Sequence, residues 1–220
     1  MTWVKICGMT NLEDALAAVE AGADAVGFVF YEKSPRNISV ETAREIVENL
    51  PESVEKVGVF VNEVEGTLCD VADRTGLTSI QMHGDREDPH VADLVVAKRP
   101  KLKVLAAVSM SQDRPENWAM MWHPDNVHAF LVDSADASKH GGTGDVFNWR
   151  ASVPVLENIK RLGRIVAAGG LTSSNVGEAM RILKPWGVDV VSGVEAKPGK
   201  KDPEKVRAFV RAVRDAEAKS

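Results

Sequence analysis

The feature that most constrains the fold is a regular alternation of short apolar runs and longer amphipathic stretches, which continues along the whole chain. The runs are rich in Val, Ile and Ala, a composition typical of parallel strands that are buried on both faces. The stretches between them place apolar residues at helical spacing, so strand and helix alternate. Eight strands are expected: Trp3–Gly8, Ala25–Phe30, Lys56–Val61, Ser79–Gly84, Lys103–Ser109, Ala129–Ser134, Arg164–Gly170 and Val188–Gly193.

Several of the intervening helices carry end signals. The first is expected to stop at Gly22, a residue type that tolerates the left-handed backbone found after a helix. Ser39 and Ser174 are expected as N-caps, and Asp202 precedes a proline, which is favourable as a first helical residue. The helix after the fifth strand is the least clear, because residues 114–125 contain two prolines. The other helices are expected over Asn11–Ala21, Val40–Leu50, Val64–Thr75, Asp88–Ala97, Asn175–Leu183 and Pro203–Ala216.

Eight strand–helix units in 220 residues predict an α/β fold of the (β/α)₈ or TIM-barrel class, with one domain over residues 1–220. The alternative is a doubly wound open sheet, which usually has fewer strands and often a glycine-rich turn after the first. Here that turn is Cys7-Gly8-Met9-Thr10, which is not a dinucleotide-binding fingerprint. The sequence contains no phosphate-loop motif and no linker, so one barrel is the simplest interpretation.

Charge and hydrophobicity exclude several classes of partner. The net charge of -5 argues against a nucleic-acid-binding protein. No apolar run approaches the roughly 18–20 residues that a membrane-spanning helix needs. The N-terminus has no signal-peptide pattern, and two cysteines do not form a disulfide framework. We therefore expect a cytoplasmic protein, a monomer or homodimer, whose partner is a small molecule.

Side chains suited to chemistry fall at the carboxyl ends of the expected strands. These ends meet on one face of a barrel, and that face carries the active site. The first strand ends with a cysteine, the fourth with a glutamine and a histidine, the sixth with an aspartate, and an arginine follows the second. The candidates are Cys7, Arg36, Gln81, His83 and Asp133.

Glycine-rich segments follow the last three strands and predict a phosphate site. A phosphate needs several backbone N–H donors, and the backbone approaches it most closely where there is no Cβ. Phosphate sites after strands seven and eight recur in this fold, often with a short helix that adds its positive end. Any one of these glycines alone would suggest an ordinary turn. The candidate phosphate-binding residues are Gly142, Gly144, Gly169, Gly170, Ser192 and Gly193.

Cys7 and Asp133 are the candidates for proton transfer. A lone cysteine at a strand end is more often buried packing, and a lone aspartate there often caps a loop. Together, however, they lie across the mouth of a closed barrel, as a base and an acid acting on one substrate would. Arg36 follows a proline, and its fork suits a carboxylate. The histidines share no metal-ligand spacing, so neither a metal nor another cofactor is expected.

Short motifs along nearly the whole chain resemble phosphoribosylanthranilate isomerase. The resemblance runs in order from Val4 to about Phe209, and Lys-Ile-Cys-Gly together with Ser-Gly-Val-Glu is its most specific part. The motifs are Lys5-Ile-Cys-Gly-Met-Thr10, Gly27-Phe-Val-Phe30, Ser34-Pro-Arg36, Val57-Gly-Val-Phe-Val-Asn62, Gln81-Met-His-Gly84, Val132-Asp-Ser134, Gly141-Gly-Thr-Gly144, Ala168-Gly-Gly-Leu171, Val191-Ser-Gly-Val-Glu195 and Gly199-Lys-Lys-Asp202.

The resemblance implies a cofactor-independent Amadori rearrangement of N-(5-phosphoribosyl)anthranilate to 1-(2-carboxyphenylamino)-1-deoxyribulose 5-phosphate in tryptophan biosynthesis. It implies Cys7 as general base, Asp133 as general acid, and Arg36 as the residue that holds the anthranilate carboxylate. One departure is Asn148, where the family commonly has Asp. This residue is expected to open the helix after the sixth strand, where either type caps well.

Two other functions remain as alternatives. A histidine-pathway sugar isomerase performs the same rearrangement, but resembles a barrel with Asp at the end of the first strand, where this chain has Cys7. A non-catalytic barrel that binds a phosphorylated ligand would need neither Cys7 nor Asp133. Measured turnover would separate an enzyme from a binding protein.

Overall fold

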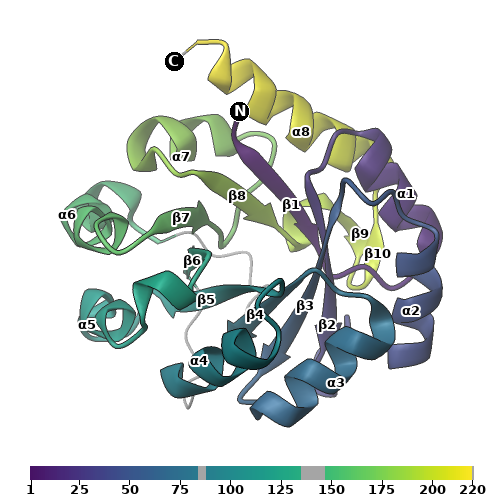
Figure 1. Ribbon diagram of the computed structural model, residues 1–220. Coiled ribbons are helices and arrows are strands. Elements are labelled where there is room, and N and C mark those ends of the chain that lie inside the picture. The colour runs from purple at the N-terminus through teal and green to yellow at the C-terminus, as the bar shows by residue number, and fades with distance from the viewer. Residues whose placement is uncertain (84–87, 135–146, 220) are drawn as a thin grey trace.

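Eight parallel strands close into a barrel in the order β1-β2-β3-β4-β5-β6-β7-β8, which confirms the predicted fold class. The computed structural model describes residues 1–83, 88–134 and 147–219. Figure 1 shows the helices arranged around the outside of the barrel. The strands are β1 (Trp3–Cys7), β2 (Ala25–Phe30), β3 (Glu55–Val61), β4 (Ser79–His83), β5 (Lys103–Ser109), β6 (Ala129–Asp133), β7 (Arg164–Ala167) and β8 (Gly187–Val190).

The helices cover the barrel with their apolar faces. Within the described residues none of them is long and apolar enough to cross a membrane. The unclear segment after β5 forms one short helix and a 3₁₀ turn. The helices are α1 (Leu12–Glu20), α2 (Val40–Glu48), α3 (Glu65–Thr75), α4 (Pro89–Lys98), α5 (Pro115–Met120), η1 (Pro124–Asn126), α6 (Trp149–Lys160), α7 (Val176–Leu183) and α8 (Pro203–Glu217).

Most of the expected helix ends are confirmed, and one is wrong. Gly22 follows α1 with a left-handed φ of 96°, and the side chain of Ser39 accepts a hydrogen bond from the backbone of α2. Asn148 likewise caps α6, so the helix keeps its N-cap although Asn stands where the family commonly has Asp. Ser174 is not an N-cap. Helix α7 begins one residue later, after Asn175, whose side chain bonds to the preceding loop instead of capping the helix.

The last two strands are shorter than the sequence suggested. Their glycine-rich ends leave the sheet, so β7 stops at Ala167 and β8 at Val190. The chain after β8 forms a single 3₁₀ turn, η3 (Ser192–Val194), where a short helix was expected. It then forms an unpredicted hairpin of β9 (Glu195–Lys197) and β10 (Lys200–Lys201) before entering α8.

The barrel interior is layered, because alternate residues of each strand point inward. An apolar cluster that includes Trp3 and Leu131 fills the amino-terminal end. Above it lies a polar layer in which Lys5 bonds to side chains of β4 and β8. Cys7 ends the same strand one layer higher, in contact with apolar residues of neighbouring strands. The polar layer therefore separates the packed core from the face where the strands end.

Candidate active site

Cys7 lies at the carboxyl end of β1, inside the barrel, with only 4% of its surface exposed. The facing residue on β2 is Gly27, where a Cβ atom would come within 2.5 Å of the Cys7 sulfur. A glycine is therefore required for the thiol to occupy this position. Burial raises the pKa of the Cys7 thiol, although the nearby charges of Lys5 and Lys201 act in the opposite direction.

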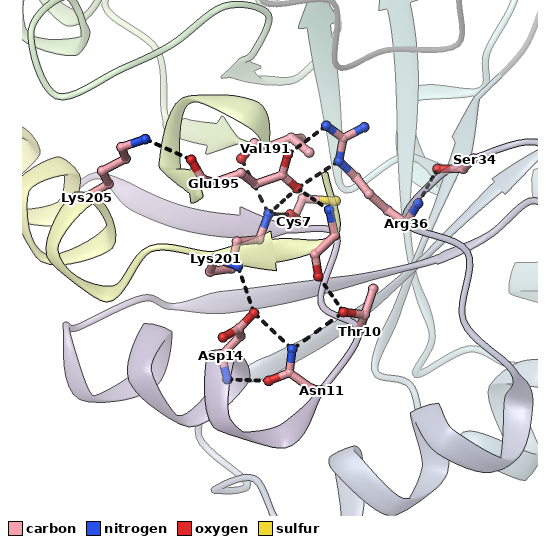
Figure 2. Close-up of polar contacts among 11 residues, drawn as sticks. Cys7, Thr10, Asn11, Asp14, Ser34, Arg36, Val191, Glu195, Lys201 and Lys205 are labelled. Atoms are coloured by element: carbon pink, nitrogen blue, oxygen red, sulfur yellow. Dashed lines mark hydrogen bonds and ion pairs between the residues drawn. The ribbon is translucent and has the colours of Figure 1, made fainter. Parts of the chain in front are cut away.

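Lys201 joins Cys7 to the hairpin after β8. Its Nζ donates a hydrogen bond of 2.6 Å to the Cys7 carbonyl and lies 3.1 Å from a carboxylate oxygen of Glu195. Its side chain is fully buried. Figure 2 shows Lys201 between Cys7 and Glu195, with Arg36 on the far side of that carboxylate. The hairpin thus fixes the end of β1 through a buried ammonium group.

Arg36 comes from the loop after β2 and reaches Glu195 with two hydrogen bonds of 2.8 Å, from Nε and from Nη2. Arg36 and Lys201 hold the pKa of the Glu195 carboxyl below its usual range, although burial alone would raise it. Among the described residues, Nη1 of Arg36 has no hydrogen-bond partner. The outer edge of the guanidinium, Nη1 and Nη2, therefore retains the donors that a second carboxylate needs.

Gln81 and His83 lie on β4 but occupy different levels. The Gln81 side chain is buried in the polar layer, where its Oε1 accepts a hydrogen bond of 2.8 Å from Lys5. His83 ends the strand two residues later and is partly exposed, and its carbonyl accepts from the N–H of Asn62. Of the two, His83 has the position from which a side chain can reach a ligand at the mouth of the barrel.

Asp133 ends β6 and lines a small cavity with residues from the ends of β7 and β8. Gly169 packs directly against it, since a Cβ there would lie 2.6 Å from an Asp133 carboxylate oxygen. Asp189 lines the same cavity from β8. The cavity also contains Ala168, Gly170, Leu171, Val190, Val191 and Ser192.

The loops after β7 and β8 are built to present backbone donors. Gly169 and Gly170 both have left-handed φ values, 80° and 62°, and within the described chain their N–H groups have no partner. The Asn175 side chain braces this loop with a 2.9 Å bond to the Gly170 carbonyl. Ser192 and Gly193 open the 3₁₀ turn η3, whose first N–H groups have no acceptor within the helix. The arrangement fits an anion such as a phosphate.

The structure brings most of the predicted candidates to one end of the barrel. Gly142 and Gly144 lie outside the described residues. In the described part of the chain no cluster of His, Cys, Asp and Glu side chains could hold a metal ion. Cys69, the second cysteine of the chain, is buried in α3.

The family model of N-(5'-phosphoribosyl)anthranilate isomerase matches residues 4–212. The N-(5'-phosphoribosyl)anthranilate isomerase of Pelobacter propionicus is 44% identical over 220 residues, which cover 100% of this chain and 99% of the relative. The chain belongs to this family.

Solved phosphoribosylanthranilate isomerases have the same fold. Monomers generated from the dimeric enzyme of Thermotoga maritima match with a TM-score of 0.83 at 40% identity, over 98% of this chain and 100% of that chain. A second structure, in complex with reduced 1-(o-carboxyphenylamino)-1-deoxyribulose 5-phosphate, matches equally well, with the same TM-score, identity and coverage. Membership of this family thus supports phosphoribosylanthranilate isomerisation over the two alternatives considered from the sequence, the histidine-pathway isomerase and the non-catalytic barrel.

Inside the barrel and in the hairpin after β8 of this phosphoribosylanthranilate isomerase fold, four buried charged residues had no role assigned from the sequence: Lys5, Asp189, Glu195 and Lys201. Three of them stand inside the family-like motifs at the start and end of the chain. Lys5 could have been found from its spacing, because it lies two residues before Cys7 and so faces the same side of the strand. The others had no comparable signal, since their partners are distant in sequence.

Proposed function

We propose that Cys7 and Asp133 carry out the rearrangement catalysed by this family, as general base and general acid. The chain is an aldose–ketose isomerase that converts N-(5-phosphoribosyl)anthranilate to 1-(2-carboxyphenylamino)-1-deoxyribulose 5-phosphate in tryptophan biosynthesis. The assignment rests on the positions of these two residues in the barrel. Cys7 ends β1 and Asp133 ends β6, at the same end of one closed barrel.

The reaction begins with ring opening. Asp133 donates its proton to the furanose ring oxygen while the bond from that oxygen to C1 breaks. The lone pair of the anthranilate nitrogen forms a double bond to C1, which gives a protonated Schiff base. A positioned proton donor accelerates such a step by about 10²–10⁴-fold.

The thiolate of Cys7 then removes the proton from C2. The electron pair of the C2–H bond forms a C1–C2 double bond, and the iminium nitrogen becomes a neutral amine. This enolamine tautomerises to the ketone by gaining a proton at C1 and losing one from the C2 hydroxyl. Because the substrate's own iminium accepts the electrons, side chains are sufficient for the chemistry and no cofactor is expected.

Two groups of hydrogen-bond donors support the proposed binding of the substrate's two anionic ends. Backbone N–H groups of Gly169, Gly170, Ser192 and Gly193 would hold the phosphate. The outer edge of the Arg36 guanidinium would hold the anthranilate carboxylate. A relative of 40% identity has been solved with the reduced product, which bears both a phosphate and a carboxyl group.

The wider setting of the enzyme is also part of the proposal. We place one catalytic domain over residues 1–220 in the cytoplasm. The Thermotoga maritima relative is described as dimeric, so a homodimer or a monomer is the expected state.

The assignment is tested by following the loss of substrate fluorescence with freshly prepared phosphoribosylanthranilate. Cys7→Ser keeps the shape of the side chain but raises its pKa far above neutrality, and should lower kcat by at least about 10²-fold. Asp133→Asn should do the same by removing the proton donor. Cys69→Ser is the matched control and should retain full activity, because Cys69 lies in α3 away from the barrel mouth.

Two further measurements distinguish chemistry from binding. The affinity for the reduced product should change little in Cys7→Ser and Asp133→Asn, since neither residue is a main anchor. The profile of kcat/KM against pH should be bell-shaped, with one limb lost in each variant. A Cys7→Ser enzyme with near-normal kcat would show that Cys7 is a packing residue.

A further inference from the structure

Lys5 carries a buried charge that the proposed reaction steps do not use. Its side chain is 0% exposed and lies inside the barrel on β1. Its Nζ donates to Gln81 Oε1 at 2.8 Å and to Asp189 Oδ1 at 3.1 Å. Burying an ammonium and a carboxylate carries a large desolvation cost, which a hydrophobic pair of the same size would not have. The charged pair therefore calls for a functional explanation.

The position of Lys5 provides one. Lys5 and Cys7 are two residues apart on the same strand, so both side chains point into the barrel. Gly27 of the neighbouring strand leaves room for both, because a Cβ there would lie 2.5 Å from the Cys7 sulfur and 3.0 Å from Lys5 Cε. The side chains of Lys5 and Cys7 thus meet in one enclosed space inside the barrel.

The charges in this space act on the thiol in opposite directions. Burial raises the pKa of Cys7, Lys5 lowers it, and Asp189 raises it. Burial by itself would lower the pKa of Lys5, but Asp189 and the Cys7 thiolate outweigh that effect and leave it raised, so Lys5 remains an ammonium. Among the described residues, the charged groups that act on Cys7 are Lys5, Asp189, Lys201 and Arg36. Behind them, Glu195 pairs with Arg36 and Lys201, and Asp133 acts on Asp189.

We propose that Lys5 is a positioning residue that stabilises Cys7 as the thiolate needed to abstract the C2 proton, while Asp189 keeps Lys5 charged and limits that stabilisation. The inference rests on the assignment of Cys7 as the general base. It gives a reason for the polar layer beneath the active site, which places one cation directly below the reacting sulfur.

A role for Lys5 in substrate binding fits the structure less well. Lys5 lies one layer below the barrel mouth, it has no exposed surface, and its donors are directed at Gln81 and Asp189. A residue in this position should affect the ionisation of Cys7, and hence kcat, with little change in the KM for the substrate.

The titration of Cys7 itself provides the test. The chain has two cysteines, so in a Cys69→Ser background only Cys7 contributes to the ultraviolet absorbance of thiolate as pH is raised. Lys5→Met should raise the pKa of Cys7 by about one pH unit or more, the usual scale for loss of a neighbouring opposite charge. Asp189→Asn should lower it. These opposite directions are not expected if the pair only supports the fold.

Two variants control for folding and for the general loss of a buried cation. The double variant Lys5→Met/Asp189→Asn removes both charges, so no buried ion is left unpaired, and its Cys7 pKa should lie between those of the single variants. Lys56→Met removes another buried ammonium, which bonds to the Pro51 carbonyl, and should leave the Cys7 titration unchanged.

The pH profile of the reaction supplies the second readout. In Lys5→Met the limb of kcat assigned to Cys7 should move to higher pH by the same amount as the thiolate absorbance, with KM nearly constant. An unchanged Cys7 titration in folded Lys5→Met, or a double variant whose Cys7 pKa is no higher than that of Asp189→Asn, would overturn this inference. A fully active Cys7→Ser enzyme would instead overturn the assignment of the base, even if Lys5 still controlled the thiol pKa.

Discussion

At the scale of single residues, Arg36 pairs with one carboxylate in the structure and is proposed to bind a second one, that of the substrate. Its Nε and Nη2 hold Glu195 in the hairpin after β8, while its outer edge is directed away from that carboxylate (Figure 2). Gly8 leaves space for this arrangement, because a Cβ there would come within 2.8 Å of the Arg36 side chain. The internal pair fixes the guanidinium, which would lower the entropic cost of the proposed contact with the substrate carboxylate.

Arg36→Lys keeps the positive charge but loses the fork. We expect it to raise KM, at a cost of about 1–3 kcal/mol of binding free energy. The matched measurement uses a substrate analogue without the ring carboxylate, with which wild type and Arg36→Lys should have nearly the same KM. Equal losses with both substrates would mean that Arg36 acts through Glu195 and the hairpin rather than on the substrate.

At the scale of elements, the ends of β7 and β8 form one unit. Gly193 packs so closely on the loop after β7 that a Cβ would lie 2.0 Å from the Leu171 carbonyl oxygen. A glycine at position 193 is therefore needed for the two loops to meet, whether or not it also contacts the phosphate. Gly170 has a left-handed φ of 62° and lies on the wall of the cavity. A side chain at Gly170 would point toward the phosphate site but would also strain the backbone at this φ, so the stability of the variant has to be measured beside its KM.

Gly170→Val should raise KM by about tenfold or more, since losing a hydrogen bond to a charged group costs about 1.5–3 kcal/mol. The kcat at saturating substrate should fall less. Gly66→Ala in α3 is the control, because nothing lies within 4 Å of a Cβ there, and it should leave KM unchanged. Thermal melts of both variants check the fold, and a normal KM in folded Gly170→Val would place the phosphate elsewhere.

At the scale of the whole molecule, the first and last segments of the chain close the barrel together. Figure 1 shows α8 running beside α1, with the two termini near each other. Asp14 of α1 accepts bonds of 2.7 Å from the backbone of Lys201 and from the side chain of Lys200. Glu195 adds its pairs with Arg36 and Lys201. Ion pairs between distant segments thus hold the active-site hairpin in place.

These pairs predict acid sensitivity. Lys200 and the Lys201 backbone hold the pKa of Asp14 below its usual range against the effect of burial, and Glu195 is held low by Arg36 and Lys201. A carboxyl group whose folded pKa is lowered contributes stability above its unfolded value, about pH 4, and loses it as pH falls through the folded value. The free energy of unfolding should therefore decrease below about pH 4.

Denaturant unfolding of Glu195→Gln across this pH range is the measurement. The variant should be less stable at neutral pH, because Arg36 and Lys201 lose their partner, and its stability should depend less on pH in the acid range. Glu20→Gln, an exposed change at the end of α1, should follow the wild-type curve. Parallel curves for Glu195→Gln and wild type would show that this carboxyl group does not govern acid unfolding.

The sequence by itself determined the barrel and the positions of the residues proposed to react. Strand and helix periodicities are local patterns, so the alternation of apolar runs sufficed to predict the order of strands. Cys7, Asp133 and the glycines after β7 and β8 followed from the rule that strand ends converge on one face. The short motifs were sufficient to indicate the family.

The pairing of charges inside the barrel was decided by the tertiary structure alone. Lys5 meets Gln81 and Asp189 across 76 and 184 residues of chain, and Lys201 meets the Cys7 carbonyl across 194. Such partners depend on closure of the barrel and on the register between strands, neither of which leaves a local pattern. The same holds for the pair of Arg36 and Glu195. Glu195 lies in the hairpin after β8, which the sequence did not predict, and this hairpin places the carboxylate beside Arg36.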